Sequence, residues 1–153
     1  MFEFLKNLFS TKKENNFINL IDILKNDHKN LIEIYQKIDN YIEKNDFTNA
    51  KQELKKFINK YNRHILLEDT QLYITLEEQY KDKKQILKVI HSISKDMNSI
   101  TRAITFFEKK YSEINENNKN EFKEEFREIG TILLDRVELE EERLYPLLNE
   151  NIK

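Results

Sequence analysis

The sequence predicts an all-α protein, namely an antiparallel up-down-up-down four-helix bundle preceded by a short N-terminal amphipathic helix. Glycine and proline each occur once in 153 residues, as Gly130 and Pro146, which is too few for the tight turns of a sheet protein. Apolar residues recur three and four positions apart over four long stretches, as they do on one face of an α-helix. Short polar segments join these stretches, which favours antiparallel neighbours in a bundle.

The first two helices are predicted at residues 16–43 and 47–78. The apolar stripe of the first contains Ile21, Leu24, Leu31, Tyr35, Ile38 and Ile42, and that of the second contains Ala50, Leu54, Phe57, Tyr61 and Leu72. Residues 44–46 form the expected turn between them. Asp46 is placed to cap the second helix, because a carboxylate can accept hydrogen bonds from the free amides of a first helical turn.

The third and fourth helices are predicted at residues 82–114 and 121–148. Their stripes contain Ile86, Ile90, Ile93, Met97, Ile100, Ile104, Phe107 and Tyr111 in the third helix, and Phe122, Phe126, Ile129, Leu133, Leu144 and Leu147 in the fourth. The polar run from Asn115 to Asn120 is the expected loop between them.

Residues 1–15 are predicted to be an amphipathic leader, and residues 16–150 to be one bundle domain. Phe2, Leu5 and Phe9 lie at helical spacing in the leader. One interpretation is a short helix packed across one end of the bundle. The other is a segment that docks on a partner or on a membrane surface.

Composition excludes several classes of function. The formal charge is -2 and both signs are mixed along the chain, so direct binding to nucleic acid is not expected. The apolar runs are too short for a membrane span, and the N-terminus does not resemble a secretory signal; we expect a cytoplasmic protein. The absence of cysteine excludes disulfides and thiolate metal sites.

Polar residues interrupt the apolar stripes at one height of the predicted bundle. They are His28, His64, Glu68, Arg136 and Glu140. Buried charges persist only when they are paired or bound to something. His64 and Glu68 are four residues apart and therefore share one helix face, a spacing that suits either a shared metal ion or a plain hydrogen bond.

The segments around these residues resemble the hemerythrin-like, or HHE, cation-binding domain. HILLEDTQLY and LEEERLYPLL repeat one pattern in the second and fourth predicted helices, and NDHKNLIEIY supplies the first-helix histidine. The resemblance extends over about residues 16–148. It implies a non-haem iron site, usually di-iron, that binds or senses oxygen, nitric oxide or redox state.

Transferred by position, the resemblance implies a specific set of metal ligands. They are His28, His64, Glu68, His91 and Glu140, with Glu141 as an alternative carboxylate. Two positions depart from the family pattern: Arg136 stands where a histidine is expected, and Ile74 where a proline is expected. A guanidinium group cannot ligate a metal. His91 also lies well to one side of the apolar stripe of its helix, which favours a surface position.

The chain is also similar to the Rsd/AlgQ regulators, bacterial proteins that bind the primary sigma factor of RNA polymerase. The similarity is carried by NEFKEEFREIGTILLDRVELEEERL, in which an arginine stands at Arg136. It implies a metal-free protein whose partner is another protein. A guanidinium between Glu68 and Glu140 would then replace the metal.

Three states of the polar layer follow from the sequence: a metal-free network, a site for one iron, and a di-iron site. We predict a hemerythrin-like bundle with an incomplete metal site that binds or senses a small ligand, without catalysis. The alternative is a metal-free regulator that binds sigma factor.

Overall fold

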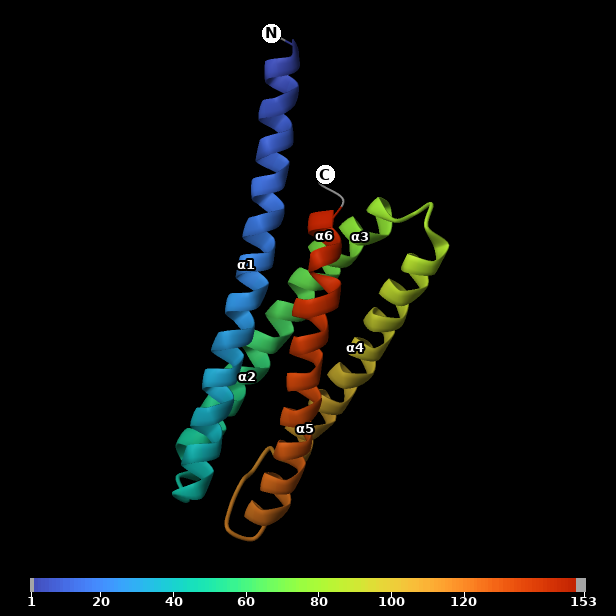
Figure 1. Ribbon diagram of the computed structural model, residues 1–153. Helices are drawn as coiled ribbons and strands as arrows, with labels where there is room; N and C mark the ends of the chain where they lie inside the picture. The colour runs from blue at the N-terminus through green and yellow to red at the C-terminus, as the bar shows by residue number, and fades with distance from the viewer. Residues whose placement is uncertain (1, 151–153) are drawn as a thin grey trace.

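The computed structural model describes residues 2–150, with side chains for residues 19–148, and contains no strand in that part of the chain. Four helical segments run alternately up and down (Figure 1). The elements are α1 (Phe2–Glu43), then α2 (Phe47–Leu67), η1 (Glu68–Leu72) and α3 (Tyr73–Gln79), then α4 (Lys84–Lys110), and finally α5 (Lys119–Leu139), η2 (Glu140–Leu144) and α6 (Pro146–Glu150). The predicted all-α four-helix bundle is confirmed.

The N-terminal leader is not a separate element, because α1 is one helix from Phe2 to Glu43. Its N-terminal part extends beyond the other helices in Figure 1. The predicted packing of Phe2, Leu5 and Phe9 lies outside the residues whose side chains the structure describes. No helix in the described part of the chain combines the length and apolarity needed to cross a membrane.

The turn between α1 and α2 follows from the chemistry of two polar residues. Asn45 has a φ of 58°, in the left-handed region that asparagine tolerates better than most residues. The Asp46 carboxylate accepts a hydrogen bond from the backbone N–H of Asn49 at 3.2 Å, which confirms its predicted role as the cap of α2. The tight turn places α1 and α2 side by side, and thereby sets the register between them.

The apolar core consists of two clusters at opposite ends of the bundle. The larger cluster, at the end with the α1–α2 turn, includes Leu54, Phe57, Phe107, Phe122 and Phe126. The second cluster, around α3 and α6, includes Leu24, Leu72, Leu76, Ile90, Leu144 and Leu148. Between the two lies a layer of buried polar side chains: His28, His64, Glu68, Arg136 and Glu140. The sequence predicted this layer from the interrupted stripes.

Gly130 allows Tyr35 to cross from α1 to α5. The Tyr35 hydroxyl donates a hydrogen bond to the Phe126 carbonyl at 2.8 Å, and the Tyr35 and Phe126 rings stack with their centroids 4.0 Å apart. A Cβ atom at position 130 would lie only 2.6 Å from Cζ of Tyr35. Glycine in the middle of a helix is usually unfavourable, so the packing of Tyr35 explains its presence here.

We predict that the effect of Gly130→Ala on stability changes sign with the residue at position 35. In the wild-type background, alanine displaces Tyr35 and removes a hydrogen bond worth about 1 kcal/mol and ring stacking worth about 1 kcal/mol. The gain in helix propensity of about 1 kcal/mol offsets only part of this loss. In a Tyr35→Ala background the same substitution stabilises by about 1 kcal/mol. Urea unfolding of the four variants tests this, and equal effects in both backgrounds would contradict it.

Candidate metal centre

The buried polar layer draws its side chains from three of the four helical segments. His28 comes from α1, His64 and Glu68 from the α2–η1 junction, and Arg136 and Glu140 from the α5–η2 junction. None of the five is more than 5% exposed. The three helices bring these residues to the same height because neighbouring antiparallel helices rise equally per residue.

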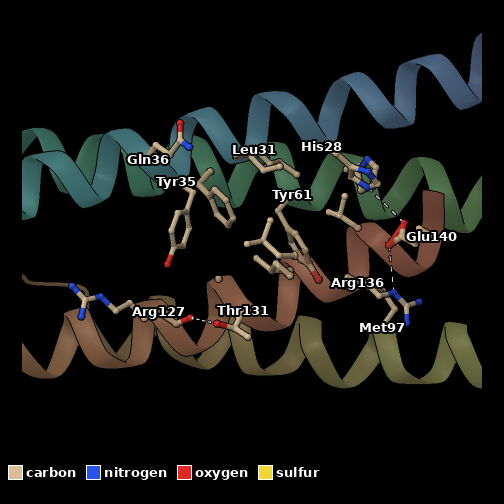
Figure 2. A pocket seen from close by; sticks show the side chains of 17 residues that line it. His28, Leu31, Tyr35, Gln36, Tyr61, Met97, Arg127, Thr131, Arg136 and Glu140 are labelled. Atoms are coloured by element: carbon tan, nitrogen blue, oxygen red, sulfur yellow. Dashed lines mark hydrogen bonds and ion pairs between the residues drawn. The ribbon is translucent and has the colours of Figure 1, made fainter. Parts of the chain in front are cut away.

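The two histidine rings face each other across the α1–α2 interface. Nε2 of His28 lies 3.1 Å from Nε2 of His64. The carboxylate oxygen Oε2 of Glu140 lies 3.7 Å from the same His28 nitrogen, and Figure 2 shows these two side chains approaching from opposite helices. One atom each from His28, His64 and Glu140 forms a set in which all lie within 4.8 Å of one another.

A carboxylate orients each imidazole from behind. Nδ1 of His28 lies 2.9 Å from Oε2 of Glu141, and Nδ1 of His64 lies 3.1 Å from Oδ2 of Asp27. A carboxylate accepts hydrogen bonds, so each pairing places the ring proton on Nδ1 and leaves the Nε2 lone pair directed at the centre. In this tautomer two lone pairs face each other, and a proton or a cation between them removes their repulsion. Histidines that bind metals are commonly held by such a carboxylate.

The centre of the layer holds more hydrogen-bond acceptors than donors. The Tyr145 hydroxyl has one proton, which it donates to Oε2 of Glu140 at 2.8 Å, although Nε2 of His28 lies within 3.3 Å of it. Oε1 of Glu68 is buried without a hydrogen-bond partner, 3.1 Å from Nε2 of His64. A buried acceptor without a partner is costly, and a cation would satisfy it.

Arg136 neutralises one carboxylate and ties the layer to α4. Its Nε donates to Oε1 of Glu140 at 3.3 Å, while its Nη2 donates to the Ile93 carbonyl at 2.6 Å and to the Tyr73 hydroxyl at 3.3 Å. The sequence placed this guanidinium between Glu68 and Glu140, and in the structure its ion pair is with Glu140. The hydrogen bond to the α4 carbonyl holds it on the α4 side of the layer, where it pairs with Glu140.

The pKa shifts show that the layer attracts positive charge. Burial, reinforced by the neighbouring Glu140 carboxylate, raises the pKa of Glu68 well above its ordinary value. Burial alone would lower the pKa of His28, but hydrogen bonds to Glu140 and Glu141 outweigh it and raise the pKa. Burial would raise the pKa of Glu140, as it does that of Glu68, but hydrogen bonds from His28 and Glu68 lower the pKa of Glu140.

A single turn of π-helix begins at each of the two buried glutamates. The turns are η1, which starts at Glu68, and η2, which starts at Glu140. In each, the backbone N–H five residues later, that of Tyr73 or Tyr145, donates to the glutamate carbonyl. π-helical turns inside α-helices are rare and occur frequently at functional sites. Here they reposition the residues that follow each glutamate.

The comparison with protein families agrees with this geometry. The family model described as the hemerythrin HHE cation-binding domain matches residues 19–148. The chain belongs to the hemerythrin HHE family. No curated protein and no solved structure gave a match. The hemerythrin match includes every residue of the polar layer and indicates cation binding as the function of this bundle.

In this hemerythrin domain the structure brings most of the predicted ligands together, but not His91. The side chain of His91 is 60% exposed and pairs with Glu77 at 3.4 Å, so its implied role as a third-helix ligand is wrong. It points outward because the buried side of α4 runs through Ile90, Ile93 and Met97. The alternative carboxylate, Glu141, contacts Nδ1 of His28 and thus orients a histidine.

Sequence reasoning missed three residues that contact the layer, namely Asp27, Tyr73 and Tyr145. Asp27 bonds to His64 across the helix interface, and the two tyrosines contact Arg136 and Glu140. A signal was present for the tyrosines, because the repeated Leu-Tyr follows each glutamate in HILLEDTQLY and LEEERLYPLL. No comparable signal singled out Asp27 from the other acidic residues of α1.

We predict that Arg136→Met destabilises the bundle by about 3–5 kcal/mol at neutral pH, because it leaves a buried carboxylate without its cation. Arg143→Met is the matched control, since Arg143 lies in η2 and is exposed. Its substitution should change stability by less than about 0.5 kcal/mol. Urea unfolding of both variants provides the comparison, and similar midpoints would show that Arg136 does not neutralise the layer.

Proposed function

We propose that this hemerythrin domain binds one iron ion through His28, His64 and Glu140, with Glu68 as a further carboxylate, and uses it to bind or sense oxygen or nitric oxide. The observation that carries the proposal is the pair of Nε2 atoms 3.1 Å apart. Both rings are fixed by carboxylates on their other nitrogen. A metal ion between them would accept both lone pairs.

The donor set supports iron as the ion. Two histidines and one carboxylate are the ligands of many non-haem ferrous sites, and the unpaired Oε1 of Glu68 adds another oxygen donor. When bound, ferrous iron supplies a redox-active centre with affinity for small diatomic ligands. The chain holds the ligands in place, since each imidazole is fixed from behind by Asp27 or Glu141.

The charge of the layer favours one ion over two. Burial raises the pKa of Glu68, but even when a bound cation ionises it, Glu68 and Glu140 contribute only two negative charges, and Arg136 contributes one positive charge. One divalent cation therefore already exceeds the remaining negative charge of the buried residues. The guanidinium at Arg136 occupies the position at which the family pattern places a histidine, and it cannot act as a ligand. These features support a mononuclear site that functions in binding.

We predict that about one ferrous ion binds per chain after anaerobic reconstitution. His28→Gln and His64→Gln should each lose the ion, because an amide is a poor replacement for an imidazole ligand. His91→Gln is the matched control and should keep it, since the His91 side chain lies on the surface. Iron analysis and the visible spectrum before and after exposure to air measure the outcome.

Binding of less than about a tenth of an equivalent by the wild type would refute the metal proposal. The network around Arg136 would then be a metal-free core, and the primary sigma factor would be the first protein partner to test. About two ions per chain would refute only the one-ion stoichiometry, and with it the assignment of Arg136 as a replacement cation.

A further prediction concerns Asp27 and Glu141, the carboxylates that contact Nδ1 of the two histidines. Asp27→Asn and Glu141→Gln should each weaken metal binding about 10- to 100-fold, because a neutral amide orients and polarises the imidazole less well. Asp39→Asn is the matched control for Asp27, since both residues are half-buried on α1. Competition with a coloured chelator measures the affinities. Equal affinities for the Asp27 and Asp39 variants would show that Asp27 has no orienting role.

A further inference from the structure

A cavity of about 340 Å³ lies between α1 and α5, on the side of the polar layer that faces the α1–α2 turn. Apolar side chains form most of its walls, among them Leu31, Phe57, Met97 and Leu133. His28 and Glu140 form its inner end, and Tyr35 lies at the other end in Figure 2. The cavity therefore has an apolar body and one polar end.

The volume is much larger than a diatomic ligand requires. A cavity of roughly 150 Å³ lined by apolar side chains is sufficient to hold benzene. The present cavity is more than twice that size, which suits a molecule with two fused rings. Pockets that bind small organic molecules have volumes of about 300–1,000 Å³, apolar walls and a few convergent polar groups, and this cavity has all three properties.

The cavity opens to solvent along the groove between α1 and α5. Gln36, Thr131 and Leu134 line it and are exposed, whereas His28 and Glu140 are buried. A molecule that enters through this groove meets the apolar walls first and the polar layer last. Its orientation is thereby fixed, with the polar group directed inward.

The inner end selects the kind of polar group. Nε2 of His28 and Nε2 of His64 are both directed at the centre of the layer, and Glu140 adds a carboxylate. The charged side chains that line the cavity are those of Glu140, Arg136 and Arg127. Arg136 is paired with Glu140 and donates to the Ile93 carbonyl, and Arg127 lies toward the other end in Figure 2. The acceptors at the inner end are therefore the imidazole nitrogens and the Glu140 carboxylate, which favour an uncharged hydrogen-bond donor.

We propose that the α1–α5 cavity is a binding site for an aromatic molecule of two-ring size that carries a hydrogen-bond-donating group such as a hydroxyl. The rings lie against Leu31, Phe57 and Met97, and the hydroxyl donates to the acceptors at the His28 and Glu140 end. The polar end of the cavity shares His28 and Glu140 with the proposed iron site, so the test uses metal-free protein. The cavity extends the chemistry of this bundle from diatomic ligands to organic ones.

The test uses 2-naphthol as the probe and chelator-treated full-length protein, so that it can fail or succeed independently of metal binding. We expect one saturable site per chain by calorimetry. The rings should also shift the methyl NMR signal of Met97, which is assigned by its loss in Met97→Leu. Naphthalene and 2-naphthoate should both bind more weakly, because neither has a proton to donate.

Thr131→Trp and Thr105→Trp are matched variants for blocking the mouth. Both threonines are exposed, and each donates its hydroxyl to the carbonyl four residues earlier. Only Thr131 lines the cavity. The natural chain has no tryptophan, so the emission of each variant reports whether the new ring is buried. We expect blue-shifted emission for Thr131→Trp and 2-naphthol affinity at least about tenfold weaker, a loss of 1.4 kcal/mol or more, with no change for Thr105→Trp.

Three results would overturn the proposal. They are the absence of saturable binding to the wild type, binding that leaves the Met97 signal unmoved, and equal affinities of the two tryptophan variants. Tighter binding of 2-naphthoate than of 2-naphthol would overturn the assignment of a hydrogen-bond-donating head group. Loss of iron binding would have no bearing on any of these measurements.

Discussion

Two imidazole nitrogens that face each other in the middle of the core impose the main constraint on this bundle. Nε2 of His28 and Nε2 of His64 are 3.1 Å apart, and each ring is held from behind by a carboxylate. Two buried lone pairs in this arrangement repel each other unless a cation or proton lies between them. Arg136 supplies positive charge to the layer, and Tyr145 supplies a hydrogen-bond donor; both bond to Glu140.

The polar layer is stable because apolar packing surrounds it on both sides. The cluster of Phe107, Phe122 and Phe126 closes one end of the bundle, and that of Leu72, Leu144 and Leu148 closes the other. Buried ion pairs contribute little net stability in general, although breaking one is costly. The two clusters therefore provide most of the stability, while the layer fixes the register of the helices and provides the site.

The fold was predictable from the sequence, and the site only in part. Amphipathic stripes and the near-absence of glycine and proline specify the four helices, and the interrupted stripes place His28, His64 and Glu68 in the core, as the structure confirms. Contacts between helices were not predictable. Asp27 reaches His64 on another helix, and Arg136 bonds to the Ile93 carbonyl on α4, and neither partner follows from spacing along one helix. The π-helical turns were not anticipated either, because the periodicity of an α-helix does not indicate them.

The position of Arg136 connects the site with the space beside it. Its hydrogen bonds to Ile93 and Tyr73 hold the guanidinium at the α4 side of the layer, so that Glu140 is paired on one oxygen while the other faces His28. His28, His64 and Glu140 line the cavity together with Arg136, so this arginine borders both the polar layer and the open space. Further positive charge between the two imidazoles would come from a bound ion or a proton. In the proposed site, the arginine that favours one ion over two also leaves the surroundings of that ion open toward the α1–α5 groove.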